Sequence, residues 1–181
     1  MSNRRVVSMT RQKFLLTKHC VTIHYPLENC SEKLPRIPKE FKLQYTDYNI
    51  HCVFVKSNQL LVVLGLLNTS TQREGVAIFD ILSRKWRMGN GMPCSRCYFA
   101  CAASSADGLV YVTGGIHRKP WRYCEQPWVY NVEENMWEFL PPMNYDVLFY
   151  PFAVGCTDGR FYVVPRKMDN IIQVYDPHDH A

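Results

Sequence analysis

Short apolar runs alternate with polar, turn-rich stretches along most of the chain. Each run has four to seven residues, which is the usual length of a β-strand and too short for a typical helix. In the middle of the chain the predicted strands are residues 97–103, 109–113, 127–130 and 136–140. The same order occurs earlier, at 49–55, 60–64, 76–80 and a fourth strand opened by Trp86, and again later, at 150–155, 160–164 and 172–176. The pattern therefore predicts repeated antiparallel units of about four strands.

Marker residues recur at a spacing of 51 positions. Trp86 and Trp137 are one such pair, and Asp80 and Asn131 are another. A period near 50 with strand-like segments is typical of propellers and solenoids, whose units bury their apolar faces against their neighbours. The repeat therefore indicates a scaffold for binding rather than a catalytic fold.

Turn residues separate the predicted strands. Asp107-Gly108 predicts a two-residue type I′ hairpin, because both central residues of that turn need positive φ. Gly114-Gly115 closes the second strand of the middle copy, whereas the first copy keeps only Gly65. Trp137 is expected to fill the wedge between sheets while its N–H finds an acceptor. Burial there predicts that alanine at this position costs about 3–5 kcal/mol.

The start of the chain looks like the end of another copy. Residues 23–25 match 129–131, and residues 29–35 match 135–141, so that Ser31 stands where Trp is expected. A missing wedge residue predicts weak packing of this first unit. The predicted organisation is an N-terminal extension, 1–19, and a repeat region, 20–181, with copies at 20–38, 49–93, 97–143 and 150–181.

The middle copy resembles the kelch repeat. The resemblance lies in residues 109–115, ending in Gly114-Gly115, followed by Tyr130-Asn131, Trp137 and Pro142-Met143. Residues 76–80 with Trp86, and residues 140–143, are similar to plant F-box/kelch-repeat proteins. The resemblance implies an all-β fold: a partial kelch-type propeller of about three and a half blades, each a four-stranded antiparallel sheet. Its structural positions are Gly65, Trp86, Gly114, Gly115, Tyr130, Trp137 and Tyr175.

In that family the kelch repeats recruit a target protein, and an N-terminal F-box joins a ubiquitin ligase scaffold. Residues 1–19 are too short and too basic for an F-box. A six-bladed ring needs about 300 residues at about 50 per blade. We therefore expect a fragment, or an open array that a partner completes.

The resemblance also implies a binding face, formed by the loop after the second strand and the loop that enters the next blade. Arg, Trp and Tyr often anchor interfaces, and cations beside aromatic rings suit an acidic or phosphorylated peptide. The alternative is a solvated turn, 116–125, with Trp121 packed back on its blade. The candidate residues are Arg73, Ser95, Arg96, His117, Arg118, Trp121, Arg122, Tyr123 and Tyr145; Lys119 belongs to the same loop as His117, and Arg166 and Lys167 contribute more weakly.

Composition excludes several other classes. The net charge of +5 comes from scattered residues without a basic run, which argues against nucleic acid as a partner. The longest apolar stretch, 60–67, is far short of the roughly 20 residues that cross a bilayer. With no secretory signal visible, the eight cysteines are expected to stay reduced in the cytoplasm or nucleus.

Metal and catalytic motifs are also missing from the sequence. Cys94, Cys97 and Cys101 are too few for a structural zinc site, which usually needs four ligands. No nucleophile elbow, Walker loop or zinc-protease motif occurs. We expect no metal, no cofactor and no enzymatic activity. The predicted function is a protein-binding module that recognises substrates for an F-box type (SCF) ubiquitin ligase. The alternatives are an assembly module that pairs through open strand edges and a truncated fragment without function.

Overall fold

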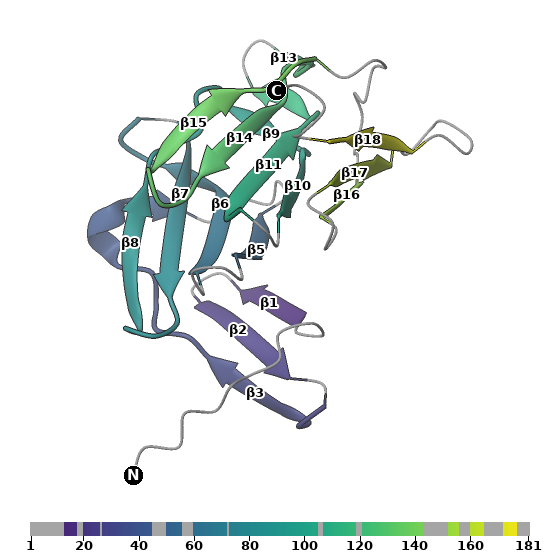
Figure 1. Ribbon diagram of the computed structural model, residues 1–181. Coiled ribbons are helices and arrows are strands. Elements are labelled where there is room, and N and C mark those ends of the chain that lie inside the picture. Colours follow the sequence, from purple (N-terminus) through teal and green to yellow (C-terminus); the bar gives the residue numbers. More distant parts are fainter. Residues whose placement is uncertain are drawn as a thin grey trace. The chain divides into compact units, whose positions relative to one another are not determined.

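The computed structural model describes residues 13–17, 20–25, 27–44, 50–55, 60–71, 73–104, 107–118, 121–142, 152–155, 160–164 and 172–176. Apart from one 3₁₀ turn, η1 (Lys39–Phe41), every regular element among them is a β-strand (Figure 1). The chain divides into two units, Met1–Ile37 and Pro38–Ala181. The predicted all-β class is confirmed.

The first unit is a three-stranded antiparallel sheet, β1 (Lys13–Thr17), β2 (Cys20–Tyr25) and β3 (Cys30–Lys33), in that order. His24 pairs with Ser31 in the register that Tyr130 and Trp137 share further along the chain. The alignment of Ser31 with the Trp position is therefore confirmed. A hydrogen bond of 2.9 Å between His24 Nδ1 and Ser31 Oγ takes the place of an aromatic stack. Strand β1 lies within the segment predicted as an extension.

The second unit begins with a sheet built around the long strand β6. Its strands are β4 (Leu43–Gln44), β5 (His51–Val55), β6 (Leu60–Asn68), β7 (Arg73–Asp80) and β8 (Lys85–Gly89). Strands β5 and β4 pair with successive parts of one edge of β6. The opposite edge of β6 pairs with β7, which in turn pairs with β8. Gly65 has a φ of 83°, and the register with β7 shifts between Leu64 and Leu66. This bulge lets β6 continue beyond residue 64, where the predicted strand ended.

The second sheet of this unit has the order β10 (Ala100–Ala103), β11 (Leu109–Thr113), β14 (Trp128–Asn131) and β15 (Met136–Phe139). The predicted strand 97–103 is wrong as one element. Tyr98 has a φ of 58°, and this left-handed residue separates β10 from β9 (Arg96–Cys97), which pairs in another sheet. A third sheet contains β16 (Phe152–Gly155), β17 (Phe161–Val164) and β18 (Gln173–Tyr175).

The 51-residue spacing corresponds to one repeated turn. Asp80 Oδ1 accepts hydrogen bonds from the backbone N–H groups of Leu82 and Ser83, at 2.8 and 3.0 Å. Asn131 Oδ1 accepts the equivalent hydrogen bonds from the backbone N–H groups of Glu133 and Glu134, at 3.1 and 3.2 Å. Each turn ends on a residue with positive φ, Arg84 or Asn135. A short side-chain oxygen at this position thus stabilises the turn between the two outer strands.

The turn between β10 and β11 differs from the prediction. The Ser104 N–H donates to the Leu109 carbonyl at 2.9 Å, so the connection between the strands is longer than two residues. Gly108 has a φ of 76°, while Asp107 Oδ1 accepts a hydrogen bond from the Leu109 N–H at 3.1 Å. The Asp side chain therefore stabilises a longer connection, and the type I′ assignment is wrong.

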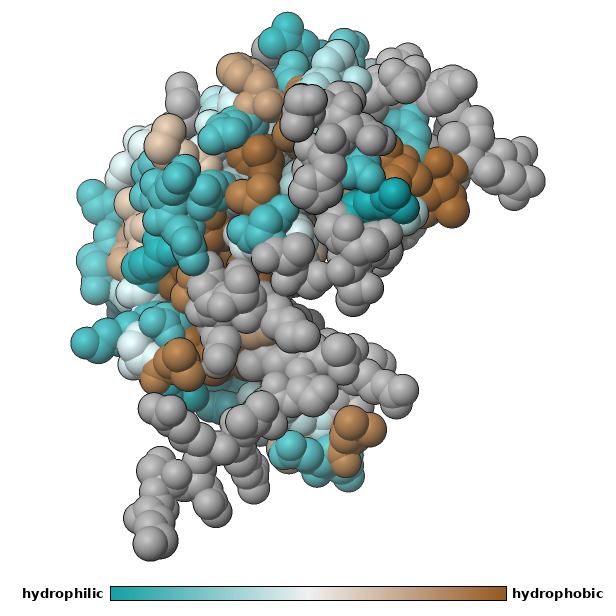
Figure 2. All heavy atoms as spheres, viewed as in Figure 1, coloured by the Kyte–Doolittle hydropathy of each residue, from teal (hydrophilic) through white to brown (hydrophobic). Residues whose placement is uncertain are grey.

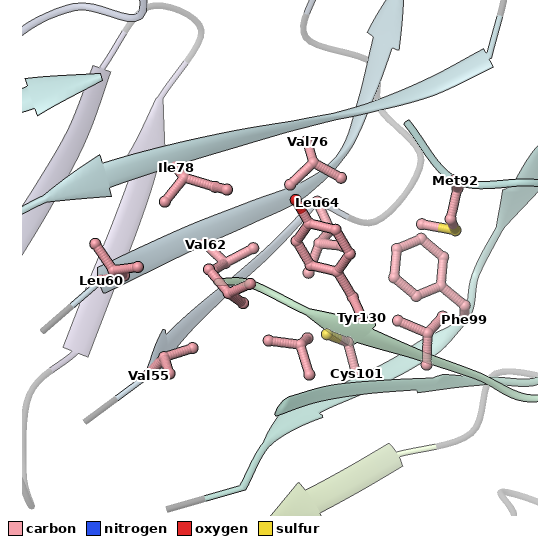
Figure 3. Close-up of a cluster of buried hydrophobic side chains, with 13 residues drawn as sticks. Val55, Leu60, Val62, Leu64, Val76, Ile78, Met92, Phe99, Cys101 and Tyr130 are labelled. Atoms are coloured by element: carbon pink, nitrogen blue, oxygen red, sulfur yellow. The ribbon is translucent and has the colours of Figure 1, made fainter. Parts of the chain in front are cut away.

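Side chains from the first two sheets of the second unit form one core between them (Figure 3). Its buried members are Val55, Leu60, Val62, Leu64, Val76, Ile78, Met92, Phe99, Cys101, Val110, Val112, Tyr130 and Val132. A second core joins the second and third sheets through Ala102, Tyr111, Val129, Leu140, Phe161 and Val163. Strand β10 lies beside both β5 and β16. Face-to-face sheets with adjacent inner strands are the arrangement of propeller blades.

The two repeat tryptophans extend this packing at the outer strands. Trp86 lies against Phe79, with ring centroids 4.9 Å apart, and Trp137 stacks on Tyr130 at 4.7 Å. Trp137 Nε1 donates to the Asn90 carbonyl, 2.9 Å away, and so links the second sheet to the first. Both indole rings are half-buried. On the visible face, hydrophilic and hydrophobic groups are mixed over β8 and β15 (Figure 2), as expected of strands with one side in water.

The burial of His51 predicts that the stability of the second unit depends on pH. Its ring lies 4.6 Å from that of Phe99, and burial lowers its pKa from 6.5 to about 4. Between these values the unfolded chain binds a proton that the folded chain does not. The free energy of unfolding is therefore expected to fall as pH drops from about 6.5 to about 4, by about 3 kcal/mol in total. Urea unfolding at several pH values gives the free energy of unfolding of wild type and of His51→Phe. That free energy should fall more steeply with decreasing pH in wild type than in His51→Phe over this window; parallel pH profiles would contradict the assignment.

Candidate functional site

A β-hairpin projects from the second sheet where a loop was predicted. Strands β12 (Ile116–Arg118) and β13 (Trp121–Tyr123) pair with each other, and β12 also pairs with β9. Gly114 and Gly115 have φ values of 63° and 90°. A Cβ on Gly115 would lie 2.6 Å from the Cys97 carbonyl oxygen, so only glycine fits. The two glycines let the chain turn from β11 into this small sheet.

Aromatic and basic side chains of the hairpin face solvent. Trp121 is 64% exposed and Tyr123 is 46% exposed, and Arg122 between them is exposed as well. Alternation along a strand places Trp121 and Tyr123 on one face and Arg122 on the other. Trp121 therefore does not pack back on its blade. We call His117, Trp121, Arg122 and Tyr123 the hairpin patch; His117 is half-buried and pairs across the strands with Arg122.

Arg96 does not belong to an exposed face, contrary to the prediction. Its side chain is 1% exposed and donates from Nη1 to the Gly114 carbonyl at 3.2 Å and from Nη2 to the Gln126 carbonyl at 2.9 Å. Its backbone N–H donates to Glu74 Oε2 at 3.1 Å. The guanidinium thus holds both ends of the hairpin. An arginine fits this place because its planar fork reaches several acceptors at once.

The remaining predicted binding residues are placed as follows. Ser95 is half-buried, and its Oγ is buried. Arg73 begins β7 and Arg118 ends β12, but their side chains lie outside the described part of the structure. Tyr145, Lys119, Arg166 and Lys167 lie outside the described residues altogether. Among the predicted residues whose side chains are described, the structure places four on the hairpin, with Trp121 and Tyr123 on one face and His117 and Arg122 on the other.

Several residues that support the hairpin were missed in the sequence. Glu74 is buried in β7, and its carbonyl accepts the Met92 N–H at 2.9 Å. Gln126 Nε2 donates to the Leu140 carbonyl at 2.6 Å. A carboxylate at the start of an apolar strand was the available signal for Glu74, because buried charges are almost always paired. Gln126 offered no comparable signal.

Two thiols lie at the base of the hairpin. Arg96 donates to Cys94 Sγ from Nε at 3.3 Å and from Nη2 at 3.0 Å. A side-chain hydrogen bond also joins Cys94 and Cys124; it lowers the pKa of Cys94, which Arg96 lowers further, and raises the pKa of Cys124. Within the described ranges, no three His, Cys, Asp or Glu side chains are grouped as a metal site. The absence of a metal or cofactor stays a prediction. No helix in those ranges is long and apolar enough to cross a membrane.

Comparisons with known proteins point to one family. The family model described as the kelch motif matches residues 97–144. The F-box/kelch-repeat protein At1g80440 of Arabidopsis thaliana is 37% identical over 114 residues, which cover 61% of this chain and 30% of the relative. At1g15670 of the same plant is 38% identical over 98 residues, which cover 52% of this chain and 27% of the relative. At1g16250 is 35% identical over 145 residues, which cover 71% of this chain and 36% of the relative.

The chain spans only about a third or less of the length of At1g80440 and At1g15670. The matched kelch motif contains β10 to β15, and hence the hairpin patch and the whole second sheet. The repeated turns and the face-to-face packing of the sheets agree with the match. The chain therefore contains kelch repeats arranged as part of a β-propeller, and it is similar to plant F-box/kelch-repeat proteins.

Proposed function

We propose that this chain is a protein-interaction module that recognises a target through the hairpin patch, as the substrate-recognition part of an F-box type ubiquitin ligase receptor. The observation that carries the proposal is the exposure of Trp121 and Tyr123 on a hairpin whose base is held by a buried arginine. Large exposed aromatic residues on a rigid support are the usual anchors of an interface. The ligase role rests on the names of the relatives, which are F-box/kelch-repeat proteins.

The chemistry of the patch favours an acidic segment of the target. Arg122 and His117 lie opposite each other on neighbouring strands, on the other face of the hairpin from Trp121 and Tyr123. The arginine on one face can bind a carboxylate or phosphate, while the aromatic rings on the other face pack on apolar side chains of the target. The net charge of +5 attracts an acidic partner over a longer range. We place this activity in the cytoplasm or nucleus, where cysteines such as those of this chain stay reduced.

Replacing Trp121 with alanine is expected to weaken target binding by at least about 30-fold, or about 2 kcal/mol. The reason is that Trp121 offers the largest exposed apolar surface of the patch. The measurement is titration calorimetry with a target first captured by the wild-type chain and then purified. Leu82→Ala is the matched control, since Leu82 is 73% exposed but lies in the β7–β8 turn.

The ligase role needs a separate experiment. The captured target should be ubiquitinated in a reconstituted reaction when the chain is supplied within its F-box protein, and Trp121→Ala should slow that reaction by the same factor as binding. Equal binding by wild type and Trp121→Ala would remove the patch from the interface. Normal binding without ubiquitination would retain the interaction module and reject the ligase role. A concentration-dependent dimer in light scattering would instead support assembly through strand edges.

A further inference from the structure

Cys94 and Cys124 come from distant parts of the sequence and meet beneath the hairpin. Cys94 lies in the segment between β8 and β9, and Cys124 directly follows β13. The backbone N–H of Cys124 donates to the Gly115 carbonyl at 2.9 Å, which fixes its position against the glycine turn. The two thiols are joined by a side-chain hydrogen bond. The fold thus brings two cysteines that are distant in the sequence into contact.

The surroundings give the two sulfur atoms different roles. The Arg96 guanidinium contacts Cys94 Sγ through two nitrogens, at 3.3 and 3.0 Å. His117 on β12 makes a smaller contribution that also lowers the pKa of Cys94. Cys124 is 1% exposed, and its hydrogen bond with Cys94 and its burial raise its pKa. A cation beside a thiol stabilises the thiolate, which is the reactive form of cysteine.

In the part of the chain that the structure describes, the other thiols lack this combination. Burial raises the pKa of Cys52 to about 12, and it also raises the pKa of Cys101. Exposed Cys30 lies beside the Glu28 carboxylate, at 3.7 Å, instead of a cation. Cys94 is half-buried and hence reachable by a small molecule. Exposure, a cationic neighbour and a second thiol in contact are the features of a redox-active pair.

We propose that Cys94 and Cys124 form a reversible thiol–disulfide pair that is oxidised by hydroperoxides. The Cys94 thiolate attacks the terminal peroxide oxygen and breaks the O–O bond, which gives a sulfenic acid and, after protonation, an alcohol or water. The Cys124 thiol then attacks the sulfenic sulfur, the S–S bond forms, and the S–O bond breaks with release of water. The two thiols lose two electrons and two protons to the peroxide. Reduction by a dithiol restores both cysteines.

The disulfide would change what holds the hairpin. In the reduced state Arg96 pairs with the Cys94 sulfur while it also holds the Gly114 and Gln126 carbonyls. Oxidation removes the negative charge from that sulfur and joins the segment before β9 covalently to the end of β13. The pair therefore couples the redox state to the support of the hairpin. This inference concerns the chemistry of the thiols and does not depend on the proposed binding function.

The test is peptide mapping of the folded chain after brief treatment with hydrogen peroxide and alkylation of the remaining thiols. The expected product is a cross-linked peptide pair that contains Cys94 and Cys124 and returns to two separate peptides with dithiothreitol. Cys124→Ser should instead accumulate a sulfenic acid on Cys94 that dimedone traps. In Cys94→Ser the Cys124 thiol should stay unmodified. Cys30→Ser is the control and should leave the cross-link unchanged.

A second measurement on the wild-type chain avoids any folding defect of the variants. Cys94 should react with iodoacetamide at about pH 6 at least tenfold faster than exposed Cys30, since thiolates beside cations persist at that pH. Equal rates at the two cysteines would overturn the proposal. A cross-link between Cys124 and Cys97, or peroxide oxidation of Cys94 without any cross-link in the wild type, would overturn it as well.

Discussion

Arg96→Ala is expected to lower the free energy of unfolding of the second unit by about 3–5 kcal/mol. The Arg96 side chain is 1% exposed, and it donates to the Gly114 and Gln126 carbonyls and to Cys94 Sγ. Removing a donor from a buried acceptor costs about 1–3 kcal/mol for each acceptor. The cavity left by the side chain adds to this cost. Urea unfolding followed by tryptophan fluorescence measures the difference.

Two further variants test whether the planar guanidinium of Arg96 is needed besides its charge, and whether the loss of stability is specific to Arg96. Arg96→Lys keeps the charge but not the planar fork, so it should recover only part of the lost stability. Arg122→Ala removes an exposed arginine from the same hairpin and should change stability by less than about 0.5 kcal/mol. If Arg96→Ala unfolded at the same urea concentration as Arg122→Ala, the inward role of Arg96 would be refuted.

Tyr130→Ala should cost a similar amount, about 3–5 kcal/mol, since large aromatic residues in a core cost this much when truncated. Tyr130 is fully buried in the core between the first two sheets (Figure 3), and its ring stacks on Trp137. Its hydroxyl donates to Asn135 Oδ1 at 2.5 Å, and the same oxygen accepts the Asn90 N–H at 2.7 Å. A Cβ at Gly89 would overlap the Tyr130 hydroxyl, so strand β8 is shaped around this side chain.

Companion variants distinguish the ring from the hydroxyl. Tyr130→Phe keeps the ring and should lose only about 1 kcal/mol. Trp137→Ala should cost less than the 3–5 kcal/mol expected from the sequence, because its ring is half-buried and not enclosed. Met136 is 53% exposed on the same strand, so Met136→Ala is the surface control. Calorimetric unfolding gives the order; a larger loss for Trp137→Ala than for Tyr130→Ala would show that the wedge, not the core, dominates.

Some features of the fold depend on residues that are close in the sequence, and these were predictable. Strand β11 has the predicted bounds, Leu109–Thr113, because an apolar run between turn residues has few alternatives. The turns after Asp80 and Asn131 are also local, since each side chain bonds to the backbone two and three residues further on. The pairing of His24 with Ser31 followed from the same alignment.

The errors fall where distant segments decide the outcome. Residues 96–97 leave the second sheet because β12 offers them a partner about twenty positions later. The segment 116–125 pairs with itself and with β9, although it contains the polar residues of a loop. Arg96 was predicted to be a surface cation, because its acceptors, the carbonyls of Gly114 and Gln126, are distant in the sequence.

The sequence by itself determined a repeated all-β chain, its outer turns and the aromatic residues of its repeats, because strand length, turn chemistry and periodicity are local properties. The tertiary structure decided which charged and sulfur-containing residues lie inside. The contact of Cys94 with Cys124, the burial of Arg96 and the exposure of Trp121 all depend on where the glycine turn directs β12 and β13. Burial and contact depend on how segments that are distant in the sequence pack against each other, and the local sequence pattern does not specify that packing.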